Sequence, residues 1–182
     1  CLEPWHYSEQ IELTPKMDLI TYDICYEVNS YGGKIVHEGI SNSFFSFEVS
    51  VQDDYCAPII TAEPDNGYRF VQWSDGSTDP QRQDTNIHED ITITAEFVRV
   101  YNLTFTAGEG GTIQGETSQI VDEGATPTSV TAVPDEGYRF ERWEYVVNAT
   151  TRYFWSPTIT PTLNDISLLL GMEYRAVFTK IE

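Results

Sequence analysis

The chain has 182 residues, 40% of them hydrophobic and 13% aromatic, so it is long enough to bury one sizeable core or two small ones. Its 29 acidic and 10 basic residues give a formal net charge of −19, which repels phosphate backbones and anionic membrane surfaces and excludes nucleic acid as an expected partner. No apolar run approaches the roughly 18 residues that a membrane span needs, so membrane insertion is not expected either.

Residues 1–20 precede the first clear strand pattern, and we interpret them as an N-terminal lead. Their segment 11–15 is faintly similar to segment 159–161, so the tail of a preceding truncated repeat is one origin for them. The chain opens on Cys1 rather than on methionine, and we therefore expect a processed form or a cut fragment. Two interpretations of Cys1 stay open, a bacterial lipid anchor and the end of a fragment.

Alternation of apolar and polar side chains begins in the segment that follows. Apolar residues stand at every second position from 22 to 28, which predicts a half-buried strand. The pair Gly32-Gly33 supplies the positive φ angles that a tight turn needs, so we expect a hairpin there. Cys25 lies in this strand and Cys56 further along the same repeat. A Cys25–Cys56 bridge in an oxidising compartment is one interpretation, and two inert thiols are the other.

One sequence motif occurs twice in the chain. Thr-Ala-x-Pro-Asp-x-Gly-Tyr-x-Phe-x-x-Trp runs from Thr61 to Trp73 and again from Thr131 to Trp143. Each copy has to be one folding unit, so the duplication predicts two tandem modules, 21–100 and 101–182. The Pro-Asp-x-Gly part is turn chemistry, after which a strand follows. Duplication also argues against an enzyme, because an active site is usually a single constellation of residues.

The tryptophan that ends each motif allows two interpretations. Strict alternation places Tyr68 and Phe70 on one face of the strand and Arg69 with Trp73 on the other. Either a β-bulge returns Trp73 to the core, or the indole lies outside beneath Arg69 in a cation–π contact worth about 0.5–2 kcal/mol. The same choice applies to Trp143. We expect packing in a core or between modules, with ligand-facing indoles that stack on a sugar as the alternative.

Residues 75–79 follow Trp73 and offer oxygen ligands on a turn, so a calcium site and a simple loop both stay open there. The second copy lacks this segment, and carboxylates elsewhere are scattered as on a soluble surface. His6, His37 and His88 stand apart in sequence, without the spacing of a zinc site, and are expected in exposed loops. Calcium apart, we expect no cofactor and no metal.

The two copies are joined by segment 97–101, which lacks Gly, Pro and Ser, so we expect stiff coupling and a rod-like arrangement. Beyond Trp143 the second copy carries an insertion with three adjacent aromatics, Tyr153, Phe154 and Trp155. These cannot all face inward from one extended segment, so we expect them to cap the end of the array or to form an adhesive patch. Strong alternation from 166 to 178 predicts a long final strand.

The repeats resemble the bacterial surface repeat called the divergent internalin B-repeat. The resemblance rests on the Tyr-initiated strand, the Gly-Gly turn, the duplicated motif and the segment Ile-Thr-Ile-Thr-Ala-Glu-Phe, and it covers about residues 21–182. It implies small β-rich modules, compared with the β-grasp fold, that are strung along secreted or cell-wall proteins of bacteria. It carries no catalytic residues to transfer. The chain departs from the pattern in its longer final strand and in Glu-Tyr-Val after Trp143.

The expected fold is therefore mainly β, with two tandem small β-rich modules, β-grasp-like, in a rod-like arrangement. The expected function is that of non-catalytic repeat modules in a secreted or cell-surface bacterial protein, acting as a stalk, spacer or adhesive segment. The alternative is a glycan-binding module that uses exposed aromatics. We expect a host or cell-surface protein or a glycan as partner, and an extracellular or cell-surface location.

Overall fold

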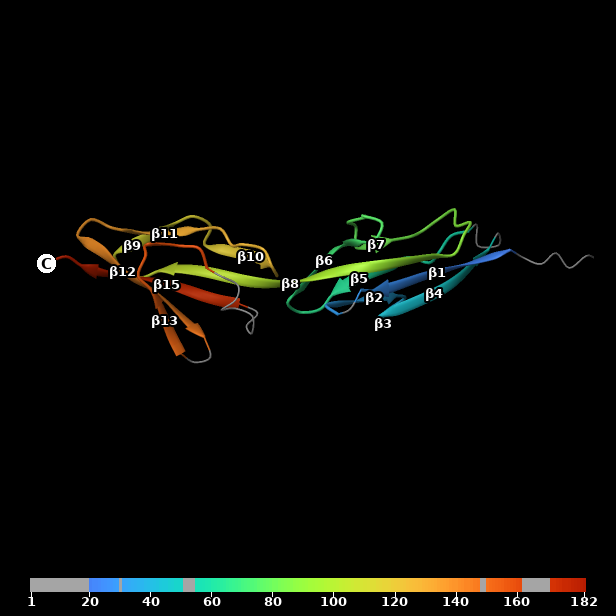
Figure 1. Cartoon of the computed structure of the whole chain (residues 1–182), viewed down its shortest axis with the longest axis horizontal. Helices are drawn as coiled ribbons and strands as arrows, with labels where there is room; N and C mark the ends of the chain where they lie inside the picture. The colour runs from blue at the N-terminus through green and yellow to red at the C-terminus, as the bar shows by residue number, and fades with distance from the viewer. Residues whose placement is uncertain (1–19, 30, 51–54, 148–149, 162–170) are drawn as a thin grey trace, which may run out of the picture.

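Figure 1 shows the computed structural model, which describes residues 20–29, 31–50, 55–147, 150–161 and 171–182. Within these residues the chain is built from strands and contains no helix, as the alternation of side chains predicts. Accordingly, the described part of the chain has no helix that could cross a membrane. Cys1, His6 and the rest of the N-terminal lead up to residue 19 lie outside the described residues, and so do residues 166–170 of the predicted final strand.

The strands of the first repeat belong to two sheets. They are β1 (Thr21–Val28), β2 (Gly33–His37), β3 (Ile40–Asn42), β4 (Phe44–Ser50), β5 (Ile60–Pro64), β6 (Tyr68–Trp73), β7 (Gln81–Arg82) and the first half of β8 (Ile91–Ala107). The larger sheet has the order β4-β1-β8-β6, and the smaller sheet has the order β3-β2-β5-β7. The core of the repeat draws its side chains from both sheets.

The second repeat has the same plan, with the additional strand β13 at the edge of its larger sheet and, among the described residues, no counterpart of β3 in its smaller sheet. It uses the second half of β8 and then β9 (Gly111–Gln114), β10 (Ser118–Asp122), β11 (Val130–Pro134), β12 (Tyr138–Val147), β13 (Thr150–Phe154), β14 (Thr158–Ile159) and β15 (Gly171–Lys180). Its larger sheet has the order β13-β12-β15-β8-β10, and its smaller sheet has the order β14-β11-β9. The predicted mainly β fold with two tandem repeats is confirmed.

In both repeats the first and last strands pair in parallel at the centre of the larger sheet. Ile24 of β1 lies opposite Ile91 of β8, and Leu103 of β8 lies opposite Met172 of β15. Parallel neighbours need a crossover connection, which here passes through the smaller sheet. The crossover thus covers one face of the larger sheet and leaves the other face to solvent.

The strand β8 is common to both repeats. It is 17 residues long, and its first half pairs with β1 and β6 while its second half pairs with β10 and β15. Figure 1 shows it running through the middle of an elongated molecule whose two modules lie end to end. The predicted boundary at 100 and 101 therefore falls inside a continuous strand, which explains why the sequence has no linker there.

Among the described residues, the buried apolar side chains form two separate clusters. The first contains Ile24, Tyr26, Ile35, Val49, Ala57, Ile60, Ala62, Trp73, Ile87, Ile93 and Ala95. The second contains Tyr101, Leu103, Phe105, Val121, Val130, Ala132, Trp143, Tyr145, Ile159, Met172, Tyr174, Ala176 and Phe178. Tyr68 and Tyr138 occupy equivalent places, because the first ring lies against Gly32 and the second against Gly110.

The Gly-Gly pairs do not form hairpins. β1 and β2 belong to different sheets, as do β8 and β9, so Gly32-Gly33 and Gly110-Gly111 carry the chain from the larger sheet into the smaller one. The hairpin predicted at Gly32-Gly33 is therefore wrong, although Gly32 has the expected positive φ angle of 107° and its equivalent Gly110 one of 90°. The second glycine of each pair instead allows an aromatic ring of the last strand to approach the backbone.

Candidate functional site

A β-bulge turns both signature tryptophans into the cores. The pairing of β6 with β8 shifts between Phe70 and Gln72, and the pairing of β12 with β15 shifts at the equivalent point. One extra residue in a strand reverses the alternation of the side chains beyond it. Trp73 and Trp143 are consequently 0% exposed. This corrects the alternative in which these two indoles face a ligand, because neither is open to solvent.

Each buried indole N–H donates a hydrogen bond to a backbone carbonyl oxygen. Trp73 donates to Asp79 over 2.8 Å, and Trp143 donates to Pro157 over 3.1 Å. The indoles therefore fix the segment that follows the signature strand in each repeat. The expected packing of Trp73 in a core is confirmed, and the alternative contact with Arg69 is not found; it is Arg82 whose Cζ lies 5.1 Å from the centre of the Trp73 ring.

Arg82 belongs to a polar network at the core of the first module. Its guanidinium donates to Asp84 over 2.5 and 2.8 Å and to Asp75 over 2.9 Å, and the Tyr26 hydroxyl donates to Asp84 over 2.5 Å. Burial, together with the hydrogen bond to Asp84, raises the pKa of Tyr26 well above its usual range. The hydrogen bond from Arg82 lowers the pKa of Asp75. These groups act as structural partners of one another.

Segment 75–79, for which a calcium site was one of two interpretations, uses its carboxylates in hydrogen bonds within the chain. Asp75 binds Arg82 and accepts a hydrogen bond from the backbone N–H of Ser77, and the carboxylate of Asp79 accepts one from the backbone N–H of Gln81. Within the described ranges, no group of three or more His, Cys, Asp or Glu side chains is arranged to hold a metal ion. The oxygens of this turn serve the loop itself.

Two of the histidines lie in different settings. His37 lies in β2, where its ring is 5.1 Å from that of Phe47, so the expectation of an exposed loop is wrong for this residue. His88 is exposed in a loop and contacts Asn86 over 3.0 Å. Cys25 and Cys56 are both partly buried and are not bridged to each other, which corrects the interpretation in which they form a disulfide.

Two of the three adjacent aromatics, Tyr153 and Phe154, end the strand β13, which forms a hairpin with β12, and Trp155 follows directly after it. Phe154 stacks on Tyr145 at 5.1 Å with an interplanar angle of 8° and packs against the second core. Tyr153 and Trp155 are 48% and 69% exposed, and their ring centres are 6.1 Å apart. The hairpin projects from the side of the second module (Figure 1), so the predicted cap on the end of the array is wrong. Of the five candidate aromatics, only Tyr153 and Trp155 are presented to solvent.

The junction between the modules is held by backbone hydrogen bonds on both sides of β8. The N–H of Val100 donates to the carbonyl oxygen of Gly67 over 2.8 Å, and the N–H of Glu123 donates to that of Arg99 over 2.8 Å. The first bond ties the turn before β6 to β8, and the second ties the end of β10 to it. Both bonds lie at the boundary between the two cores.

An ion pair joins the two modules directly across the same boundary. Arg69 of β6 donates through Nε to Asp122 of β10 over 2.7 Å, and its Nη2 binds the second oxygen of the same carboxylate. The hydrogen bond from Arg69 lowers the pKa of Asp122. The alternation of apolar and polar residues could not predict this pair, because alternation reports on neighbours within one strand. Arg69 and Asp122 are 53 positions apart and belong to different repeats. We call the ion pair and the two backbone bonds the junction contacts.

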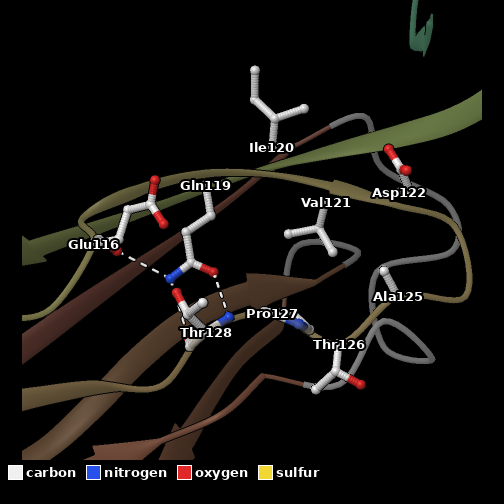
Figure 2. Close-up of a pocket in the computed structure, with 9 residues that line it drawn as sticks. All are labelled: Glu116, Gln119, Ile120, Val121, Asp122, Ala125, Thr126, Pro127 and Thr128. Atoms are coloured by element: carbon white, nitrogen blue, oxygen red, sulfur yellow. Dashed lines mark hydrogen bonds between the residues drawn. The ribbon is translucent and has the colours of Figure 1, made fainter. Parts of the chain in front are cut away.

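A surface hollow beside the junction is shown in Figure 2. Gln119 of β10 is buried behind it, and its Nε2 donates to the carbonyl oxygens of Glu116 and Thr128 over 3.0 and 3.1 Å. Its Oε1 accepts a hydrogen bond from the N–H of Thr128 over 2.9 Å. The amide is thus used within the chain, where it fixes the loop that follows Asp122.

These features define a tandem pair of β-repeats whose cores are separate and whose shared strand is continuous. A sequence model of the divergent InlB B-repeat domain matches residues 50–100 and 101–181, which is more than half of the chain. The chain therefore belongs to this family, and the resemblance found in the sequence is confirmed. Domains of this family are typically found in bacterial surface proteins. No curated protein matches the chain.

Proposed function

We propose that this pair of repeats is a rigid spacer in a secreted or cell-surface bacterial protein, with a mechanical rather than a catalytic role. The observation that carries the proposal is β8, because one unbroken strand of 17 residues contributes to both cores. A hydrogen-bonded strand that enters two packed cores cannot bend freely between them. Such a segment holds whatever it connects at a fixed distance and angle.

The junction contacts support the same role. Arg69 and Asp122 join β6 to β10, and the two backbone bonds join each of these regions to β8. Rotation of one module about β8 would break these contacts, so they oppose twisting as well as bending. An adhesive segment would benefit from the same stiffness, because a stiff arm presents its binding surface at a constant distance from its anchor.

The polar groups inside the first module support a non-catalytic role. Tyr26, Arg82 and Asp84 are bonded to one another rather than directed at an open site. In the second module Ile159 stands at the place of Arg82, and the buried amide of Gln119 is likewise bonded within the chain, to the backbone of Glu116 and Thr128. A reaction carried out by both modules would need the same polar groups in each. Two modules that share a fold but differ in their buried polar groups therefore favour a structural role.

Residual dipolar couplings of the backbone N–H groups test the rigidity of the intact chain. We expect the couplings of both modules to fit one alignment tensor. Insertion of Gly-Ser-Gly-Ser between Arg99 and Val100 interrupts β8, so the two modules should then require tensors of different magnitude. The same insertion after Gly39, in the exposed turn between β2 and β3, is the matched control and should leave a single tensor.

Two unrelated tensors for the unaltered chain would contradict the spacer. The location is tested separately, with antibodies raised against the two repeats. These should label intact bacteria that make the protein, and labelling that requires lysis of the cells would overturn the surface location.

A further inference from the structure

We propose that the outer face of the β12–β13 hairpin binds an uncharged glycan, with Tyr153 and Trp155 as the stacking surfaces. We call Tyr153, Trp155, Arg142 and Glu144 the hairpin platform. The proposal goes beyond the spacer, because it concerns one face of one module and does not depend on the rigidity of the pair.

The register of the hairpin brings the four side chains of the platform to one face. Glu144 lies directly opposite Tyr153, and Arg142 lies two positions earlier in β12, with its guanidinium 5.5 Å from the centre of the Tyr153 ring. Trp155 follows the end of β13 and is placed beside them by its contact with Tyr153. The rings of Tyr153 and Trp155 are 6.1 Å apart at an interplanar angle of 35°, so they form a shallow angled surface. A sugar ring has an apolar C–H face that stacks on such a surface, while its hydroxyl groups point outward to polar neighbours.

Arg142 fixes the platform before any ligand arrives. Its Cζ lies 5.5 Å from the centre of the Tyr153 ring, and its guanidinium binds both Glu141 and Glu144. The guanidinium of Arg142 is thus fixed by two carboxylates and in turn restrains the ring of Tyr153. This restraint lowers the conformational entropy that Tyr153 would lose on binding a ligand. Both hydrogen bonds from Arg142 to Glu144 end on Oε1, over 3.0 and 2.6 Å, so the lone pairs of Oε2 are available to a sugar hydroxyl.

Charge and size select an uncharged glycan over other ligands. The net charge of −19 repels anionic polymers at long range, which disfavours nucleic acids and acidic polysaccharides. A large aromatic side chain presents about 150–250 Å², so the two partly exposed rings offer on the order of 300 Å². A stable protein interface needs roughly 800 Å² from each partner. The platform is therefore too small to dock a folded protein and large enough for one or two sugar rings.

The first module provides an internal comparison. There the strand β6 ends at Trp73, and the chain turns back at once through a hydrogen bond from the N–H of Gly76 to the carbonyl oxygen of Trp73. No strand equivalent to β13 follows β6 in the described residues of that module. The platform is thus particular to the second repeat, and the core does not explain it, because Phe154 alone supplies the packing.

Calorimetric titration of the intact chain with uncharged hexasaccharides tests the proposal. The probes are β-1,4-linked hexamers of glucose, of mannose and of N-acetylglucosamine, with a sulfated hexasaccharide as the anionic comparison. We expect at least one uncharged hexamer to bind, and Trp155→Ala and Tyr153→Ala each to raise Kd about tenfold or more. Trp155→Phe should retain part of the affinity, since a smaller aromatic face remains.

Tyr31→Ala is the matched control, because Tyr31 is 76% exposed and lies in the first module. This control should leave Kd unchanged, and all variants should keep the Tm of the parent, since the substituted rings lie outside the cores. Three results would overturn the proposal: no binding of any uncharged hexamer, unchanged Kd after replacement of both platform rings, or preferred binding of the sulfated probe. None of these results would bear on the rigidity of the spacer.

Discussion

At the scale of single residues, the two repeats fill equivalent places with different chemistry. Arg82 pairs with Ile60 in the first small sheet, and Ile159 pairs with Val130 at the matching place in the second. The first repeat therefore buries a guanidinium beside the largely covered carboxylate of Asp84, where the second buries a hydrocarbon. The carboxylates of Asp84 and Asp75 compensate the buried charge, although Nη1 of Arg82 is buried without a hydrogen-bond partner among the described residues.

Removal of one member of this network should strongly destabilise the first module. Arg82→Ala removes both guanidinium hydrogen bonds from the carboxylate of Asp84, which keeps the bond from the Tyr26 hydroxyl but loses its positive partner, so we expect a loss of about 3–5 kcal/mol in the free energy of unfolding. Urea denaturation followed by NMR signals of the first core measures it. The triple variant Tyr26→Phe, Arg82→Ile, Asp84→Ala, which imitates the apolar interior of the second repeat, should recover most of the loss. A single substitution that costs less than the triple variant would contradict this account.

At the scale of elements, the connection from the larger to the smaller sheet depends on the second glycine of each Gly-Gly pair, Gly33 or Gly111, although its φ angle is ordinary. A Cβ at Gly33 would lie 2.4 Å from the ring of Phe97, and a Cβ at Gly111 would lie 2.3 Å from the ring of Phe178. The same steric condition occurs in both repeats. The first glycine of the pair makes the turn, and the second leaves room for the last strand to close the core.

Gly111→Ala should therefore destabilise the second module through overpacking. We expect a loss of about 1–3 kcal/mol in the free energy of unfolding, measured by chemical denaturation. Gly111→Ala combined with Phe178→Leu should recover part of the loss, because a smaller side chain relieves the overlap. Gly39→Asn is the control, since nothing lies within 4 Å of a Cβ at Gly39 and asparagine tolerates its φ angle of 79°. Equal losses for Gly111→Ala and the control would refute the steric explanation.

At the scale of the whole molecule, we expect the junction contacts to hold the two modules as one stiff body. The strand β8 resists bending, and the pair of Arg69 with Asp122 resists rotation about that strand. The ion pair is partly exposed, with side-chain exposures of 47% and 33%, so its contribution to unfolding is small. Its effect should appear in the relative orientation of the modules instead.

Arg69→Met should loosen the junction while leaving both cores intact. We expect a Tm close to that of the parent but increased motion between the modules, measured as a difference in the tensors that fit their dipolar couplings. Arg139→Met, at the equivalent position of the second repeat, is the control and should change neither quantity.

Acid should loosen the junction in the same way. The pKa of Asp122 is lowered by Arg69, so the ion pair is fully present above the ordinary carboxyl range and is lost as pH falls through the lowered value. A junction that stays equally rigid in Arg69→Met and at low pH would show that β8 alone sets the orientation.

Local patterns in the amino-acid sequence were enough to predict the strands, the duplication and the absence of a linker. Alternation at every second residue reports directly which face of a strand is buried, and a repeated motif requires a repeated unit, so both are local properties of the chain. The two separate cores and the continuity through segment 97–101 followed from them.

The positions of several important side chains, by contrast, depend on contacts between distant parts of the chain. Trp73 points inward because a bulge against β8 shifts its register, and Arg69 reaches Asp122 rather than the indole because the next module places a carboxylate beside it. The Gly-Gly pairs change sheets because the rings that pack on them come from strands far along the chain. Each of these outcomes depends on a neighbour that is distant in sequence, and the local pattern contains no information about such neighbours.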